Sequence, residues 1–131
     1  MACNLTEVLE KHTEYLAQQW ARTLHSEALS SYADRPLEEL IDTTTHAAEM
    51  NRAALVDGDF SKIDAFINEV SKMRLEAGFS LSEVQWAFEL YRTLLTPILV
   101  KELQGDVLLS AFKSLNVCLS RTIFAFSDYF L

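Results

Sequence analysis

The C-terminal stretch constrains this chain more than any other part of it. From Asp106 to Leu131, apolar side chains recur every three or four residues without a break, which is the spacing of an amphipathic helix. The last eight residues, 124–131, contain no Gly, Asn or Pro and no basic side chain, so the usual signals that end a helix are missing. We expect this helix to project as a stalk or linker into an output domain, or to pair with its own copy.

Helix-start and helix-stop residues predict two more helices in the first half of the chain. Asn4 with Glu7 three residues later resembles a capping box, and Pro36 suits the first position of a second helix. Gly58 is expected to close that second helix. The inward positions of the first helix are predicted to include His12 and Tyr15.

The second half of the chain contains equally clear residues for beginning and ending helices. A third helix is expected to begin near Asp59 or Ser61, to bury Met73 among other apolar residues and to stop at Gly78. Ser80 and Glu83 form a capping-box pattern for the fourth helix, within which Pro97 is expected to cause a kink or an early end. Gly105 is expected to close this helix, and Asp106 to cap the fifth. No alternating strand pattern competes, so the sequence predicts one all-α, five-helix domain over residues 1–131.

Composition narrows the classes of function. Half of the 131 residues are hydrophobic and only five are Gly or Pro, which favours a packed core over disorder. The net charge of −8 argues against nucleic acid and against anionic membrane surfaces as partners. No uninterrupted run of about 18 apolar residues is present, and the N-terminus lacks a secretory signal pattern. With Cys3 and Cys118 far apart and not at metal-ligand spacing, we expect a cytoplasmic protein without membrane insertion.

Two helices carry more apolar side chains than a single core needs. On the fifth helix, Val117, Phe124 and Leu131 recur every seven residues on a face that is otherwise polar, through Ser110, Lys113, Ser114, Ser120, Arg121 and Asp128. A seven-residue apolar repeat is typical of a contact between helices. On the fourth helix, three further apolar residues fall opposite the main core stripe and form a second candidate surface: Trp86, Leu90 and Pro97. The sequence therefore predicts a homodimer.

The sequence offers no combination of side chains that favours catalysis. Of the three histidines, only His12 falls on an apolar helix face, and a lone inward histidine is more often a hydrogen-bonded core residue than a ligand. Exposed His46 is followed by Ala47-Ala48-Glu49, where the carboxylate would repel a phosphoryl group. No serine has the partners of a catalytic triad, and no glycine-rich phosphate loop is present. We expect neither enzyme activity nor a metal or other cofactor.

The stretch Arg74-Leu75-Glu76-Ala77-Gly78-Phe79-Ser80-Leu81-Ser82-Glu83-Val84 carries a resemblance to a known family. With the residues that follow it and two upstream segments, 35–40 and 56–60, it resembles the N-terminal sensor domains of RsbR-type stressosome proteins, the RsbT co-antagonist family. That resemblance implies a globin-like helical fold without haem, usually dimeric, that serves as the input module of a signalling protein. The family offers no agreed ligand-binding residues to transfer to this chain.

These observations together predict a non-catalytic, homodimeric sensory domain that relays a change in helix packing. Its expected partners are a second copy and either an output domain after Leu131 or a stressosome-type protein. Two alternatives stay open at this point. One is a globin-like domain that binds haem or another ligand, and the other is a helical adaptor that binds its partner constitutively.

Overall fold

The structure, a computed structural model, describes residues 4–27 and 30–130, and every regular element within these ranges is helical. The elements are α1 (Leu5–Ser26), the 3-10 helix η1 (Ser31–Asp34), α2 (Leu37–Asp57), α3 (Ser61–Glu76), α4 (Leu81–Glu102), α5 (Gly105–Ser127) and the 3-10 helix η2 (Asp128–Phe130). The prediction of an all-α chain with five α-helices is confirmed for the described residues.

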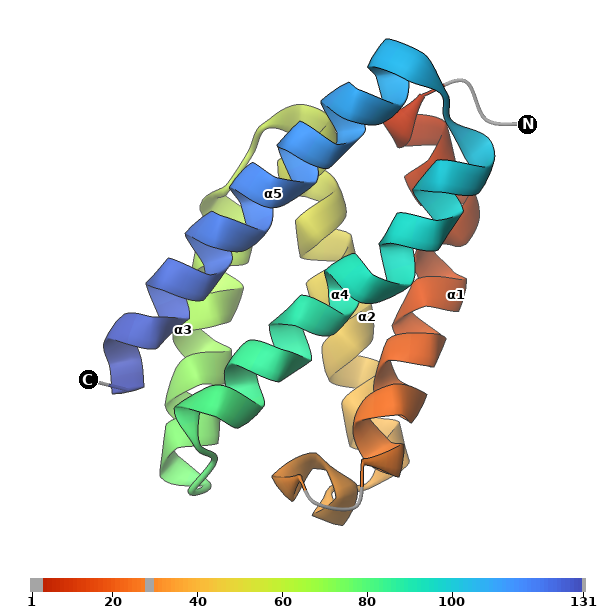
Figure 1. Cartoon of the computed structure of the whole chain (residues 1–131). Coiled ribbons are helices and arrows are strands. Elements are labelled where there is room, and N and C mark those ends of the chain that lie inside the picture. Colours follow the sequence, from red (N-terminus) through yellow and green to blue (C-terminus); the bar gives the residue numbers. More distant parts are fainter. Residues whose placement is uncertain (1–3, 28–29, 131) are drawn as a thin grey trace.

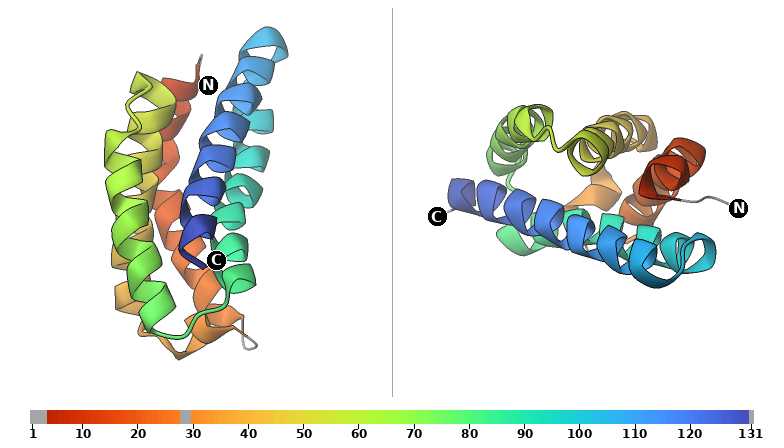
Figure 2. Two further views of the ribbon diagram at one scale, coloured as in Figure 1. Left: turned by 90° about the vertical axis from the view of Figure 1, so that its left-hand side faces the viewer. Right: turned by 90° about the horizontal axis from the view of Figure 1, so that it is seen from above.

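The helices form two layers (Figures 1 and 2). α1, α2 and α3 lie side by side in chain order, and the pair α4 and α5 covers one face of that layer. α4 lies against α1, whereas α5 lies against α3 and α2. The hydrophobic core fills the space between the layers. Because α4 contacts both α1 and α5, it is covered on two of its sides.

Several predicted helix boundaries are confirmed in atomic detail. The Ser80 hydroxyl accepts a hydrogen bond from the Glu83 backbone N–H at 3.2 Å, and the Glu83 carboxylate accepts one from the Ser80 N–H at 3.3 Å. Asn4 accepts from the Glu7 N–H at 3.0 Å at the start of α1. Gly58 closes α2 with φ +67°, a left-handed conformation that side chains with a Cβ rarely adopt.

Specific contacts between buried side chains hold the helices together, both between the layers and within each layer. The Trp20 indole N–H on α1 donates to the Ala87 carbonyl on α4 at 2.7 Å, and both groups are buried. Within the first layer, the Thr44 hydroxyl donates to the Ala17 carbonyl at 2.8 Å. Phe88 of α4 stacks on Phe126 of α5, with ring centroids 4.7 Å apart and an interplanar angle of 17°. The Trp20 hydrogen bond and the Phe88–Phe126 stack hold α4 between α1 and α5.

Three predictions about individual positions are wrong. Tyr15 was expected to face inward but is 58% exposed, and Met73 is exposed as well. Both lie on helices at the edges of the three-helix layer, where the buried stripe is narrower than the apolar pattern suggests. Asp106 does not cap α5; the helix begins at Gly105 after Gln104, and Asp106 lies in its first turn. At Pro97, where a kink or an early end of the helix was expected, only the early end is contradicted, because α4 continues to Glu102.

The end of the chain does not project as a stalk over the residues that the structure describes. η2 follows α5 directly and lies against α3, where the Tyr129 hydroxyl donates to the Asn68 side-chain carbonyl. Apolar Phe130 packs against the core instead of extending away from it. Leu131, which belongs to the predicted seven-residue repeat, lies outside the described residues, as does Cys3.

Candidate functional site

The outward side of α5 carries the most exposed apolar side chains of the described chain. Phe124 is 74% exposed and Val117 is 62% exposed. The polar residues predicted around them are all exposed too: Ser110, Lys113, Ser114, Ser120, Arg121 and Asp128. We call Lys113, Val117, Phe124 and Asp128 the outer α5 face. The predicted exposure of Val117 and Phe124 is therefore confirmed.

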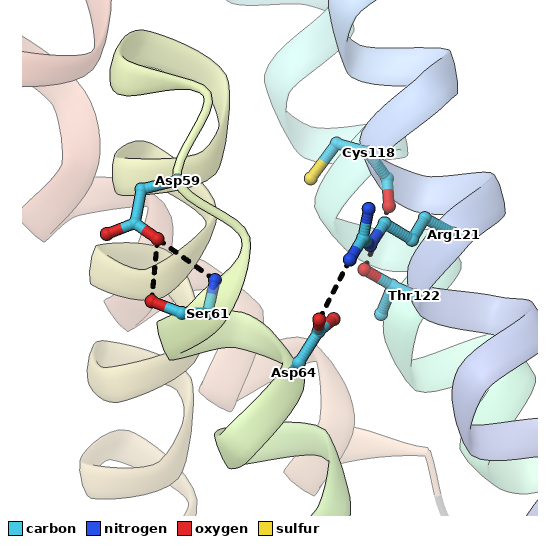
Figure 3. A network of polar contacts seen from close by, with 6 residues as sticks. All are labelled: Asp59, Ser61, Asp64, Cys118, Arg121 and Thr122. Atoms are coloured by element: carbon cyan, nitrogen blue, oxygen red, sulfur yellow. Dashed lines mark hydrogen bonds and ion pairs between the residues drawn. The ribbon is translucent and has the colours of Figure 1, made fainter.

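One charge beside this face is already neutralised within the protein. The Arg121 guanidinium donates to the Asp64 carboxylate at 2.9 Å (Figure 3). It also lies 4.4 Å from the ring centroid of Phe60. These contacts turn Arg121 toward α3. In contrast, neither Lys113 nor Asp128 forms an ion pair in the described part of the chain. The outer α5 face thus offers one cation and one anion for an external partner.

The second candidate surface, on α4, does not exist as predicted. Leu90 is only 7% exposed and belongs to the core, and Trp86 is half-buried, with its ring 6.4 Å from that of Tyr32. Only Pro97 is exposed. The physical reason is the position of α4 between α1 and α5, which buries residues on two of its sides. Trp86, Leu90 and Pro97 therefore do not form a common exposed face.

A buried cation is the feature that the sequence reasoning missed. Arg74 on α3 is 2% exposed, and its guanidinium carbon lies 5.2 Å from the ring centroid of Tyr32 and 5.0 Å from that of Phe79. Over residues 4–27 and 30–130, no carboxylate oxygen lies within 4 Å of it. Its Nε has no hydrogen-bond partner. A buried charge without an acidic partner is costly, so this arrangement requires an explanation.

Arg74 borders a small cavity of about 30 Å³ where α1, η1, α2, α3 and α4 converge. Apart from the guanidinium, the lining is predominantly apolar: Trp20, Leu24, Tyr32, Leu40, Thr43, Thr44, Ala47, Phe66, Val70, Ala87 and Phe88. Thr43 and Phe66 are partly exposed and form its outer rim. With Val70, they also line a surface groove between α2 and α3, so the cavity adjoins the solvent on that side. We call this site the Arg74 cavity.

The acidic groups nearest the cavity are engaged elsewhere. Arg35 donates two hydrogen bonds to Glu39, at 2.7 and 2.6 Å, and this interaction lowers the pKa of Glu39, with a smaller contribution from Arg74. Burial raises the pKa of Tyr32 to about 12, although the neighbouring Arg74 charge offsets part of that effect. Tyr32 is therefore neutral at physiological pH. The Arg74 cavity therefore carries one positive charge that forms no ion pair among the described residues.

His12, His46 and Cys118 lie outside both sites. His12 Nε2 is 3.2 Å from a Glu102 oxygen, and Lys11 Nζ is 2.9 Å from the other. His12 is only partly buried and lies beside this Lys11–Glu102 ion pair at the α1–α4 edge, so it is not a core residue. His46 is exposed. Burial raises the pKa of Cys118 to about 11, which keeps the thiol protonated. Among the described residues, no three His, Cys, Asp or Glu side chains are grouped so as to hold a metal ion.

The pattern of α3 contains a signal for Arg74. Buried Ile63, Ile67 and Val70 follow helical spacing, and Arg74 occupies the next position of the same stripe. The sequence prediction continued this stripe through Met73 and gave Arg74 no place in the core. Only the tertiary structure shows that Tyr32 and Phe79 cover it.

The segment Gly105–Phe130 is long and apolar enough to cross a membrane by length and composition, with a mean hydropathy of 1.3 in its most apolar window, 28% of which is buried. The sequence analysis looked for an uninterrupted run of apolar residues, and Lys113 and Arg121 interrupt this segment. The mean hydropathy of a window can be high in spite of such charged residues. A single segment of this kind is weak evidence for a membrane span, because a mostly buried core helix of a soluble protein passes the same test. Here the inward residues Leu115, Leu119 and Phe126 are completely covered by the other helices. The segment therefore has a structural role in this bundle.

In comparisons with known proteins, no family model, no curated protein and no solved structure matches this chain. The resemblance to RsbR-type sensor domains and the globin-like description of the fold therefore stay predictions.

Proposed function

We propose that this chain is a non-catalytic input domain of a cytoplasmic signalling protein and that it forms a homodimer through the outer α5 face. The observation that carries this proposal is the exposure of Phe124 and Val117 on an otherwise polar helix surface. Large exposed apolar side chains on one helix face favour a protein contact. The resemblance to RsbR-type sensor domains, which are usually dimeric, supports the same function, with an output domain or a stressosome-type protein as the further partner.

The charges on this face favour an antiparallel pairing of two α5 helices. In such a pairing about a two-fold axis between Ser120 and Arg121, Val117 of one copy faces Phe124 of the other. The same axis brings Lys113 opposite Asp128, so two ion pairs form at the ends of the contact. A parallel pairing would instead place each charge opposite its own copy, which is unfavourable. The outer α5 face is therefore self-complementary in one orientation only.

The surface beside Val117 has room for the partner's aromatic ring. A groove next to this residue is lined by the end of α2, the turn from α2 to α3, and α5, through Ala54, Leu55, Gly58, Phe60, Lys113 and Ser114. Burying a Phe side chain is worth about 2–3 kcal/mol, and a two-fold axis uses Phe124 twice. Part of this burial energy is offset by the entropy that is lost on association. The remainder is consistent with a reversible dimer whose dissociation constant is in the micromolar range.

The core offers a physical connection between the interior and the interface. Phe88 lines the Arg74 cavity and stacks on Phe126, which lies on α5 two residues after Phe124. A change of packing around Phe88 would shift Phe126 and with it the outer α5 face. In this proposal, the input alters the dimer by changing the contact between α4 and α5.

Analytical ultracentrifugation of Phe124→Glu tests the interface. We expect this variant to be monomeric at concentrations at which the wild-type chain is dimeric, because the substitution places a charge at the centre of the contact. Its helical circular dichroism should stay unchanged, since Phe124 is not part of the core.

The matched control is Tyr15→Glu, which replaces a similarly exposed aromatic side chain on α1. It should dimerise like the wild-type chain. A folded Phe124→Glu variant with an unchanged dissociation constant would refute the proposed interface.

A further inference from the structure

We propose that the Arg74 cavity binds a small organic carboxylate with a short apolar chain. The support for this binding site comes from the cavity alone. Only the role of the bound carboxylate as the signal that the domain senses rests on the proposed function. Two observations point to such a ligand. Arg74 lines the cavity and is only 2% exposed, with no carboxylate in ion-pair contact among the described residues, and its buried Nε has no hydrogen-bond partner.

The chemistry of the lining selects the class of ligand. An Arg side chain recognises a carboxylate through charge-assisted hydrogen bonds, which are strong where water is excluded. Tyr32 and Phe79 hold the guanidinium by cation–π contacts but supply no anion. Across the cavity the wall is formed by apolar groups of Trp20, Ala47 and Phe66, which suit a short alkyl chain. A phosphate group would need more donors and a second positive charge.

The dimensions limit the ligand further. A cavity of about 30 Å³ has room for a few heavy atoms at most. Acetate and propionate therefore fit this description better than longer acids. Entry is possible from the groove between α2 and α3, because Thr43 and Phe66 form the rim of both spaces. A longer chain would require the Phe66 ring to move outward.

Binding can be followed on the full chain by intrinsic fluorescence, because Trp20 lines the cavity. We expect a saturable change on titration with sodium acetate or sodium propionate, and none with sodium chloride at equal ionic strength. Loss of the charged hydrogen bonds in Arg74→Met should weaken the affinity about tenfold or more. The control Arg121→Met removes a second Arg that lies in a cation–π contact but does not line the cavity, and it should bind like the wild-type chain.

A second variant keeps the proposal testable if Arg74→Met does not fold. Ala47→Val retains the cation but fills the cavity from α2, and it should abolish binding. Phe66→Ala opens the rim and should allow butyrate to bind. No saturable change in the wild-type chain, the same change with chloride, or unaltered binding in folded Arg74→Met or Ala47→Val would each overturn the proposal.

The failure of this proposal can be separated from the failure of the dimer. Phe124→Glu leaves the cavity intact, so it should bind the carboxylate with wild-type affinity whether or not the wild-type chain dimerises. Binding in the absence of any dimer would refute the proposed interface alone. A dimer without binding would refute the carboxylate site alone.

Discussion

At the scale of single residues, Glu83 joins two segments that are far apart in the chain. One of its oxygens accepts from the Ser80 N–H, and the other accepts from the Ser31 N–H of η1 at 2.7 Å. Burial alone would raise the pKa of Glu83, but the hydrogen bonds from Ser31 and Ser80 outweigh it and hold this pKa below its ordinary value of 4.5. The carboxylate form is therefore bound more strongly in the folded chain than in the unfolded one.

This shift predicts a loss of stability in acid. Because the pKa of Glu83 is lower in the folded chain than in the unfolded one, the Glu83 carboxylate stabilises the fold fully at a pH above the unfolded-state pKa, near 4.5. This stabilisation is lost as the pH falls through the folded-state pKa. We expect Glu83→Gln to be less stable than the wild-type chain at pH 7 and to lose less stability on acidification. Urea denaturation at neutral and acidic pH measures both effects.

The control for this prediction is Glu76→Gln, because Glu76 is exposed and forms no ion pair within the described residues. Its stability should depend on pH as in the wild-type chain. Parallel pH profiles for Glu83→Gln and the wild-type chain would show that Glu83 does not bind as the structure describes.

At the scale of elements, the sequence predicts helices well where the signal is local. Ser80 with Glu83, and Gly58 with its positive φ, act through their immediate neighbours, so their roles can be read from spacing alone. Which faces of a helix are covered depends instead on the other helices. That is why Leu90 was expected outside and is buried, and why Tyr15 was expected inside and is exposed.

The Ser80 cap gives a quantitative prediction for α4. Ser80→Ala removes the acceptor for the Glu83 N–H and one half of the capping box, so it should cost about 1 kcal/mol of unfolding free energy. A reversible denaturant titration measures this value. Ser114→Ala, at an exposed position within α5, is the control and should cost nothing. A Ser80→Ala variant as stable as the wild-type chain would contradict the account of this helix start.

At the scale of the whole molecule, the fold class followed from the sequence, but the sites followed only in part. The exposed positions Val117 and Phe124 were predictable because a seven-residue apolar repeat on a polar face is a local pattern. The Arg74 cavity was not, because five elements that are distant in sequence form its wall. The same tertiary packing joins the two sites through the stacked rings of Phe88 and Phe126.

The central claim is that two copies pair through antiparallel α5 helices, and a charge-swap experiment tests it most directly. The measurement is the dimer dissociation constant, by sedimentation equilibrium, of Lys113→Asp, Asp128→Lys and the double variant. Each single variant should dimerise more weakly than the wild-type chain, because like charges then face each other across the two-fold axis. The double variant should recover most of the wild-type affinity, since the ion pairs are restored with reversed polarity. Single variants that dimerise like the wild-type chain, or a double variant that is no better than either, would contradict the claim.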